Sequence, residues 1–302
     1  MLQFRLMKWR RSLPYLALVA GVLALSLSSL FIRLADASPL VTSFYRMAIA
    51  SLVFLPFGVR SLIKQRGLKN VHFLFPIVAG TFSAFDHGIW GFAIMNTRVA
   101  NATLLNNIAP LWVALIAWLV WKEKPRSRFW VGLFLTLLGA TVVLGYDMLV
   151  HPSLSFGDLL GVSSSFFYAG YYLTTQKGRT HLPTITYVWL ATTATAIVLL
   201  LSCLISNQPL TGYSLNTYLT FLAAGLISQV SGYYAIVYAL GHLPASIVSP
   251  SMIAQPVLTA FLAIPILGEA LMPGQWLGGI AVLLGIYLVN ISSPEPQHAN
   301  TG

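Results

Sequence analysis

Two ionisable residues stand side by side in the middle of an apolar stretch. Asp86 and His87 lie within residues 72–94, and Gly88 and Gly91 follow them closely. A carboxylate at such a depth can carry a proton or bind an ammonium group, and an imidazole titrates near neutral pH. Adjacent helical residues point about 100° apart, so we expect only one of the two to face a given cavity. The alternative is an ion pair of Asp86 with an arginine of a neighbouring helix, which would only lock the packing.

One arginine lies inside another apolar stretch. Arg46 belongs to the run Phe44-Tyr45-Arg46-Met47, in the first part of residues 39–58. Charged residues inside apolar spans are costly and therefore usually functional. A guanidinium group can neutralise Asp86 or bind the carboxylate of a substrate, and the sequence leaves both interpretations open.

Two further apolar stretches carry a proline near their middle. Pro110 and Pro256 lack the N–H group that a helix needs there, which predicts a break in each helix. Amide side chains precede both prolines, namely Asn106, Asn107 and Gln255. Broken helices near the middle of the membrane often form substrate sites in transporters. We therefore predict that these amides line a cavity, with hydrogen bonding between helices as the alternative.

Aromatic and amide side chains recur at helical spacing in other stretches. Tyr168, Tyr171 and Tyr172 share one face of residues 156–176, and Trp90 falls one turn after Asp86. Buried tyrosines need partners for their hydroxyl groups. Aromatic stripes also arise from packing alone, so both interpretations stay open. The candidates of this group for the cavity wall are Trp90, Tyr168, Tyr172, Gln229 and Tyr233.

The composition of the chain is that of a polytopic membrane protein. Of its 302 residues, 57% are hydrophobic and only 8% are charged, whereas soluble domains carry roughly a quarter charged residues. The net charge of +10 comes from basic residues that flank apolar stretches, so we expect a lipid bilayer as the partner and no nucleic acid. Cys203, the single cysteine, lies in an apolar run and is expected to be a small buried residue. No phosphate loop, zinc-spaced histidine cluster or nucleophile elbow occurs, so we expect no cofactor, no metal and no enzymatic activity.

Ten apolar stretches are long enough to cross a membrane. A hydrocarbon core of about 30 Å requires around 20 helical residues, and lipid leaves the backbone no partners except its own. The sequence therefore predicts an all-α integral membrane protein with ten transmembrane helices. The ranges are 14–34, 39–58, 72–94, 98–121, 129–147, 156–176, 184–205, 215–239, 244–267 and 273–291.

The second half of the sequence repeats the first after a shift of 146 residues. Because five crossings is an odd number, the second copy must be inverted relative to the first. We predict two inverted five-helix repeats, residues 14–147 and 156–291, preceded by a cytoplasmic segment, 1–13, and followed by a disordered cytoplasmic tail, 292–302. Inverted repeats are a common architecture of secondary transporters. The aligned pairs include Pro110 and Pro256, Glu123 and Glu269, Trp130 and Trp276, Gly132 and Gly278, and Gly139 and Gly285.

Lysines and arginines predict the orientation in the membrane. The basic clusters before the first span and after the second, fourth and sixth spans fall on one side, so both termini are expected in the cytoplasm. The basic start and first apolar run also resemble a signal peptide, but the run is too long and ends at Arg33, so we expect a retained helix. The basic residues are Arg5, Lys8, Arg10, Arg11, Arg60, Lys64, Arg66, Lys69, Lys122, Lys124, Arg126, Arg128, Lys177 and Arg179.

With these features the chain resembles EamA-type transporters of the drug/metabolite transporter superfamily. The resemblance rests on Phe44-Tyr45-Arg46-Met47 and on the repeated pattern of proline, glutamate and tryptophan followed by glycine, and it extends to about Ile291. It implies a ten-helix bundle of a bacterial inner membrane that usually exports amino acids or small metabolites. It implies a central cavity lined from the first, third, fourth, sixth, eighth and ninth helices. Glu123 and Glu269 would be structural, whereas Asp86 and His87 lie outside the general pattern and would mark a subgroup's substrate or coupling ion.

We therefore expect a secondary transporter that works by alternating access and exports small polar or amino-acid-like metabolites. Arg46 would bind a carboxylate, and Asp86 would bind an amine or a coupling proton. The alternative is a passive channel for small solutes, although stripes of small residues and paired helix breaks favour moving halves. An intramembrane enzyme built on His87 would lack a second catalytic carboxylate or a metal triad.

Overall fold

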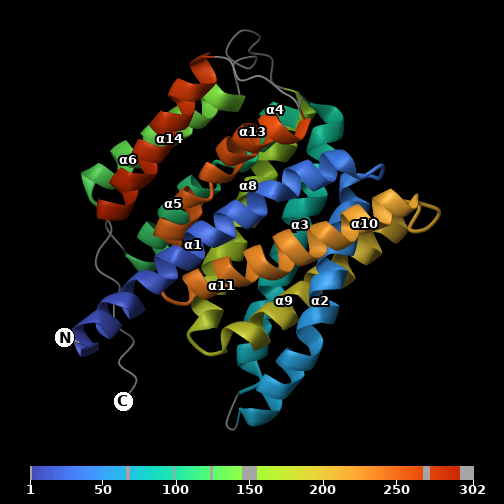
Figure 1. Ribbon diagram of the computed structural model, residues 1–302, viewed down its shortest axis with the longest axis horizontal. Helices are drawn as coiled ribbons and strands as arrows, with labels where there is room; N and C mark the ends of the chain where they lie inside the picture. The colour runs from blue at the N-terminus through green and yellow to red at the C-terminus, as the bar shows by residue number, and fades with distance from the viewer. Residues whose placement is uncertain are drawn as a thin grey trace.

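In a computed structural model, residues 2–65, 69–97, 99–122, 125–144, 155–267 and 273–292 are described, and they form a bundle of helices joined by short turns (Figure 1). These residues contain no strand, so the predicted all-α class is confirmed. The helices are α1 (Leu2–Leu34), α2 (Pro39–Lys64), α3 (Val71–Asn96), α4 (Val99–Asn106), α5 (Ala109–Trp121), α6 (Ser127–Leu144), α8 (Phe156–Arg179), α9 (Thr184–Ile205), α10 (Leu215–Ala223), the π-helix η1 (Ala224–Tyr233), α11 (Tyr234–Leu240), α12 (Ala245–Ser251), α13 (Ala254–Leu267) and α14 (Pro273–Ser292).

Seven of the described helical segments are long and apolar enough to cross a membrane. A shorter apolar helix, Ser127–Val143, lies in α6. Together with their apolar outer faces, these segments make the chain a multi-pass membrane protein. The described residues of the ten ranges predicted from the sequence are almost entirely helical, and ten crossings remain a prediction.

Several helices begin at polar residues that cap them. Ser38 accepts a hydrogen bond from the third residue of α2, whose first residue is Pro39. Ser155 and Asp158 form a capping box at the start of α8, with 2.7 Å between the Ser155 backbone nitrogen and Asp158 Oδ2. Asp158 also accepts a hydrogen bond of 2.8 Å from Thr97 Oγ1. The caps satisfy backbone groups that helices leave free, and the last contact joins the end of α3 to the start of α8.

Two membrane segments are interrupted near their middle. Residues 107–108 separate α4 from α5, and residues 252–253 separate α12 from α13. Each interruption precedes a proline, Pro110 or Pro256, by only a few residues, and the two sites are equivalent in the 146-residue repeat to within one residue. A proline cannot donate to the carbonyl of the preceding turn, which explains why both helices break at this point.

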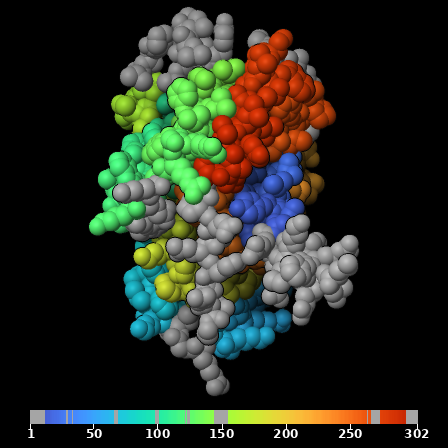
Figure 2. Space-filling view, turned by 90° about the vertical axis from the view of Figure 1, so that its left-hand side faces the viewer, coloured from blue at the N-terminus to red at the C-terminus, as the bar shows by residue number. Residues whose placement is uncertain are grey.

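Helices α6 and α14 lie side by side at one edge of the bundle (Figures 1 and 2). A Cβ atom added to Gly132 would lie 2.8 Å from the carbonyl oxygen of Gly285, and one added to Gly139 would lie 2.6 Å from that of Gly278. The early part of α6 therefore meets the late part of α14, and the helices run antiparallel. In the 146-residue repeat Gly132 corresponds to Gly278 and Gly139 to Gly285, so the two contacts are equivalent to each other.

Contacts between other helices follow the same exchange. The packing of α3 on α8 corresponds to that of α1 on η1 and α11, and the packing of α3 on α9 corresponds to that of α2 on η1. Likewise α4 and α5 pack on α8 as α12 and α13 pack on α1. The bundle is therefore organised around pairs of equivalent contacts.

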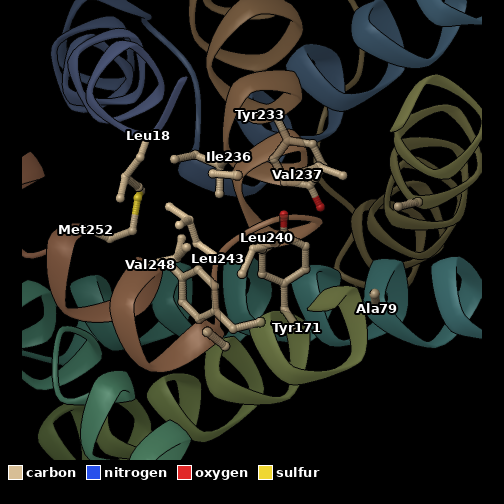
Figure 3. Close-up of a cluster of buried hydrophobic side chains, with 14 of the residues drawn as sticks. Leu18, Ala79, Tyr171, Tyr233, Ile236, Val237, Leu240, Leu243, Val248 and Met252 are labelled. Carbon is tan, nitrogen blue, oxygen red and sulfur yellow. The ribbon is translucent and has the colours of Figure 1, made fainter. Parts of the chain in front are cut away.

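The main hydrophobic cluster fills one end of the bundle, which we call the packed end. We define the packed end as the end that carries the turns at 180–183 and 241–244, and the cavity end as the end that carries the segments at 35–38 and 206–214. Figure 3 shows side chains of α1, α8, η1, α11 and α12 converging in this cluster. Its labelled members are Leu18, Ala79, Tyr171, Tyr233, Ile236, Val237, Leu240, Leu243, Val248 and Met252.

The glycine contacts between α6 and α14 predict a position that tolerates no side chain. We expect Gly139→Ala to destabilise the protein by about 1–3 kcal/mol, because the added methyl group would collide with backbone atoms of α14. Thermal unfolding of the purified protein in detergent measures the effect. The matched control is Gly274→Ala in the first turn of α14, where an added Cβ meets nothing within 4 Å. Equal melting temperatures for the two variants would contradict this account of the interface.

Candidate functional site

A central cavity of about 130 Å³ lies among α1, α2, α3, α4, α8, η1 and the segments around the second helix break. Most of its wall comes from polar or aromatic side chains, which is unusual for the interior of a membrane protein. The wall consists of Leu25, Ser28, Ile32, Arg46, Ser83, Asp86, His87, Trp90, Thr103, Asn106, Asn107, Tyr168, Tyr171, Gln229, Tyr233, Ile236, Met252, Gln255 and Pro256.

The cavity brings together most of the residues singled out from the sequence, although they come from six separate stretches of the chain. Tyr172 is an exception, because its side chain is 1% exposed and packs in the hydrophobic cluster instead. Pro110 also lies outside the wall, whereas Pro256 is part of it. The candidates that do line the cavity are Arg46, Asp86, His87, Trp90, Asn106, Asn107, Tyr168, Gln229, Tyr233 and Gln255.

Asp86 and His87 both face this cavity, so the expectation that only one of them could do so is wrong. The cavity is bounded by several helices, and a wall of that width takes in both flanks of α3. The His87 Nδ1 atom lies 2.6 Å from the backbone oxygen of Ser83, to which it donates, and 3.7 Å from Asp86 Oδ2. The imidazole is therefore oriented by its own helix.

The Asp86 carboxylate is held by an amide from the first helix break. Asn106 Nδ2 donates to Asp86 Oδ1 over 2.7 Å and to Ser164 Oγ over 2.9 Å. Asp86 is only 6% exposed. A buried carboxylate of this kind needs donors or a cation around it, because lipid and apolar side chains do not solvate charge.

The Arg46 guanidinium lies in the same cavity without forming an ion pair with Asp86. Its Nη1 atom donates to Ser28 Oγ on α1, and its Nε atom is buried without a hydrogen-bond partner among the described residues. No nitrogen of Arg46 lies within 4.0 Å of a carboxylate oxygen of Asp86. The cavity thus presents a cation and an anion that are close enough to share one wall and too far apart to neutralise each other directly.

Three more polar atoms of the wall have no hydrogen-bond partner among the described residues. They are the hydroxyl groups of Tyr171 and Tyr233 and the side-chain oxygen of Gln229. The rings of Tyr171 and Tyr233 stack with 5.4 Å between their centroids, and Figure 3 shows them extending toward each other from α8 and η1. Buried polar atoms without partners cost free energy, so their concentration at one cavity indicates a place for polar ligand atoms or water.

A π-helix places two of these residues. Gln229 and Tyr233 belong to η1, whose ten residues follow α10 and precede α11 in one continuous rod. Segments of π-helix are rare and are frequent at functional sites. Nothing in the sequence predicts this π-helix, since the residues of Ala224–Tyr233 are equally compatible with an ordinary α-helix.

The resemblance implied that the first helix lines the cavity, but the sequence singled out no residue of α1 for the wall. Leu25, Ser28 and Ile32 line the cavity from the second half of α1. Ser28 had a visible signal, a recurrence of small residues every fourth position, but that signal also predicts close helix packing. A small hydroxyl side chain in an apolar span does not reveal which of the two roles it has.

The cavity lies closer to the segments at 35–38 and 206–214 than to the opposite end of the bundle. At that opposite end, the packed end, side-chain hydrogen bonds join the helices. Arg179, at the last position of α8, donates from Nε to the backbone oxygen of Val237 over 3.2 Å and from Nη1 to that of Leu182. Gln176 Oε1 accepts a hydrogen bond of 2.7 Å from the backbone nitrogen of Ala245. Two side chains at the end of α8 thus hold the turn between α11 and α12.

A pair of stacked histidines adds to the packing at the packed end. The rings of His72 and His181 lie with 4.4 Å between their centroids and 2° between their planes. Burial, together with the nearby His72 and Lys177, lowers the pKa of His181, so its imidazole is neutral at neutral pH.

Three other expectations from the sequence concern metal ligands, the single cysteine and the two paired glutamates. Among the described residues, no group of three or more histidine, cysteine or acidic side chains could hold a metal ion. Cys203 is buried with a free thiol, as predicted. Glu123 and Glu269 lie outside the described residues.

A polar cavity enclosed by apolar helices defines a class of membrane protein that handles small solutes, and the comparisons with known proteins agree. The model of the EamA-like transporter family matches residues 12–145 and 155–291. The chain belongs to this family, and it is a transporter rather than an enzyme.

Several curated relatives support this assignment. The chain is 24% identical over 272 residues to the uncharacterized transporter YwfM of Bacillus subtilis (strain 168), covering 87% of each chain. It is 26% identical over 285 residues to an uncharacterized transporter of Archaeoglobus fulgidus, covering 92% of this chain and 97% of that one. It is 29% identical over 218 residues to the pseudopaline exporter CntI of Pseudomonas aeruginosa (strain UCBPP-PA14), covering 68% and 70%.

A solved crystal structure has the same fold. It superposes on the chain with a TM-score of 0.77 at 19% identity, over 93% of this chain and 97% of the other. At this identity the likeness concerns the fold alone.

The cavity predicts a difference in reactivity between two small residues of the membrane interior. In a Cys203→Ser background, we expect a cysteine at Thr103 to react with a small membrane-impermeant thiol reagent at least about tenfold faster than one at Ala169, because thiols react only where the reagent reaches them. Thr103 lines the cavity, whereas Ala169 is buried in α8. Mass spectrometry of the protein in liposomes gives both rates. Equal rates would show that the cavity is not reached from water.

Proposed function

We propose that the protein is a secondary active transporter that binds a small polar or amino-acid-like metabolite in the central cavity. The observation that carries this proposal is the separation of Arg46 from Asp86 within one cavity. A ligand with a carboxylate and an amine would pair with both, and it would neutralise two buried charges at once. Asp86 would alternatively take a coupling proton while Arg46 holds an anionic group.

The two halves contribute different chemistry to this site. Arg46, Asp86 and His87 come from the first half, while Tyr168, Gln229 and Tyr233 come from the second. The ionisable groups would select the charges of the substrate, and the amide and hydroxyl groups of the second half would bind its polar atoms. Aromatic rings, Trp90 among them, would form the apolar walls.

We further propose that the bundle consists of two inverted five-helix repeats, residues 14–147 and 156–291, with both termini in the cytoplasm of a bacterial cell and the chain in its inner membrane. The antiparallel contact of α6 with α14 and the paired contacts of the other helices support the inversion. The basic residues around the turns at the packed end support the orientation, since positive residues favour the cytoplasmic side.

An asymmetry between the halves supports the proposal of alternating access. At the packed end, α8 contacts both α11 and α12. Among the described residues, the equivalent pairs of the other half, α1 with α3 and α1 with α4, make no contact of that extent. In an inverted repeat the two halves can exchange their conformations, so the second state would bring α1 onto α3 and α4 and would part α8 from α11.

Export is the direction that we propose. The support is the relationship to an exporter of pseudopaline, a name that describes that relative and not this chain. A passive channel for small solutes remains the second candidate. The packed end argues against it, because a hydrophobic cluster, rather than a continuous polar path, lies between the cavity and that end of the bundle.

Asp86→Asn tests the role of the carboxylate. We expect the variant to lose flux driven by an imposed pH gradient, by about tenfold or more, while it keeps exchange of substrate across the membrane, because the amide keeps the shape but binds no proton. Flux of radiolabelled amino acids is measured in liposomes with wild type and variant. The matched control is Asp36→Asn, which changes an exposed carboxylate in the α1–α2 turn.

The outcome separates the candidates. Gradient-driven flux that is equal in wild type and Asp86→Asn would contradict a coupling role for Asp86. Accelerated exchange in the presence of unlabelled substrate on the opposite side indicates a carrier, whereas its absence in a protein that conducts would favour the channel.

Gly241→Ala tests whether the packed end opens. A Cβ atom on Gly241 would lie 2.7 Å from Nη2 of Arg179 and 3.0 Å from its Cζ, so the methyl group displaces the guanidinium group without touching the cavity. We expect this variant, like Arg179→Ala, to expose the cavity to reagents added at the packed end, with about a threefold to tenfold faster labelling of a cysteine at Ile236. Thr180→Ala, an exposed neighbour that bonds only within its own turn, is the control. Unchanged labelling in both variants would show that these contacts do not keep the packed end closed.

A further inference from the structure

The side-chain amide of Asn106 connects three helices at one nitrogen atom. It donates over 2.7 Å to Asp86 Oδ1 on α3 and over 2.9 Å to Ser164 Oγ on α8. A primary amide has two N–H groups, so both are used. Asn106 itself is the last residue of α4. The position of the end of α4 is therefore tied directly to the acidic residue of the cavity.

The backbone carbonyl of Asn106 lacks the partner that it would have in an uninterrupted helix. An uninterrupted helix would direct the N–H group of residue 110 to the carbonyl of Asn106, but residue 110 is a proline. The helix breaks at residues 107–108. The neighbouring Asn107 does not share the role of Asn106, since its amide donates over 2.7 Å to the backbone oxygen of Thr103 within its own turn. At the end of α4, the side chain of Asn106 thus makes the contacts to other helices, whereas that of Asn107 stays within its own turn.

Both sides of the break are attached to adjacent serines of α8. Asn106 attaches the end of α4 to Ser164, and Trp112 Nε1 attaches the start of α5 to Ser165 Oγ over 2.9 Å. Only the attachment on the α4 side is shared with Asp86. A change at Asp86 therefore acts on one side of the break and leaves the other side in place.

The second half lacks this connection. The break at residues 252–253 is followed by Gln255, whose Nε2 atom donates over 3.0 Å to the backbone oxygen of Leu25 on α1. Thr259 Oγ1 makes a similar bond of 2.6 Å to the backbone oxygen of Ser26. These acceptors are uncharged carbonyl groups, so they do not respond to a proton or a cation. The response to charge belongs to the first break alone.

We infer that Asn106 is a positioning residue that couples the charge of Asp86 to the break between α4 and α5. The inference rests on the proposed function, in which Asp86 meets a proton or the ammonium group of a substrate. A proton from water in the cavity adds to a carboxylate oxygen and leaves a neutral carboxylic acid, and an ammonium group pairs with the carboxylate. Protonation replaces the charged acceptor of Asn106 with a neutral one, and an ammonium group competes with Asn106 for the carboxylate oxygens. In either case the bond weakens, and the end of α4 becomes free to move relative to α8.

Other titratable and charged groups face Asp86, so the experiment needs controls that separate their effects from that of Asp86. His87 lies beside it on α3, Arg46 faces it from α2, Tyr168 from α8 and Tyr233 from η1. An imidazole ordinarily titrates near neutral pH, so the contribution of His87 is the one that a control must remove. A response of α4 that survives in His87→Gln and disappears in Asp86→Asn belongs to Asp86.

The experiment follows the end of α4 with a thiol probe and needs no substrate. Full-length protein in liposomes carries Cys203→Ser and a reporter cysteine at Thr103, one turn before Asn106. The labelling rate with a membrane-impermeant maleimide is measured between about pH 5 and pH 8, and each rate is divided by that of the same reporter with Asp86→Asn. We expect a change of about fivefold across this range in the otherwise unchanged protein, because a charged acceptor is replaced by a neutral one.

Asn106→Ala should abolish this pH response, although Asp86 is still present. Trp112→Phe removes the attachment on the other side of the break and should keep the response. The exchange Asp86→Asn with Asn106→Asp restores an acid and an amide between α3 and α4, so it should recover the response if the single variants fold poorly. A full response in Asn106→Ala, or no recovery in the exchanged pair, overturns the inference.

The result is independent of whether a substrate has been found. If flux of amino acids is absent while the labelling response follows Asp86 and Asn106 as expected, the proposed substrate class is wrong and the coupling stands. If flux depends on Asp86 while labelling ignores pH, the coupling through Asn106 is wrong and the proposed function stands.

Discussion

The structure depends on the cost of charge in an apolar environment. Arg46 and Asp86 are each about 6% exposed, and they are surrounded by helices whose outer faces meet hydrocarbon. A direct ion pair would lower the cost of both, yet the nearest groups to them are the hydroxyl of Ser28 and the amide of Asn106. Buried charges that are held apart by neutral donors and acceptors remain available to a ligand. The amide and hydroxyl groups of the cavity wall give these two charges a polar environment inside the bundle.

The helices that hold the cavity differ in how firmly they are joined. Glycines bring α6 and α14 into backbone contact at two equivalent places, so the two helices are closely packed along this edge of the bundle. The segments that line the cavity are interrupted, at residues 107–108 and 252–253, or are widened, as in η1. Rigid contacts therefore lie at the edge and deformable segments lie around the site. That distribution suits a protein in which the wall of the site moves relative to a fixed support.

The sequence predicted the parts of this design that contrast with their surroundings. Asp86 and Arg46 stood out because the chain around them is apolar, and the all-α class followed from the length of the apolar stretches. Ser28 and η1 were not found, because a serine in an apolar span can serve packing or binding and a π-helix has no local signature. Tyr172 does not line the cavity, although it was a candidate. Its i and i+4 spacing with Tyr168 places both on one broad face of the helix, and only part of that face borders the cavity. Tertiary contacts decide such cases, and a sequence does not contain them locally.

The central claim is that the two ends of the bundle open in turn around one site, and distances between spin labels test it most directly. One pair of labels at Leu34 and Met95 spans the cavity end, and another at Thr180 and His242 spans the packed end; all four side chains are exposed. The account predicts opposite changes, so that a population with a shorter distance at the cavity end has a longer distance at the packed end, on the order of 5 Å or more for rearrangements of whole helices. Distances at the two ends that lengthen together, or that never change with pH or added amino acids, would contradict alternating access and favour a channel.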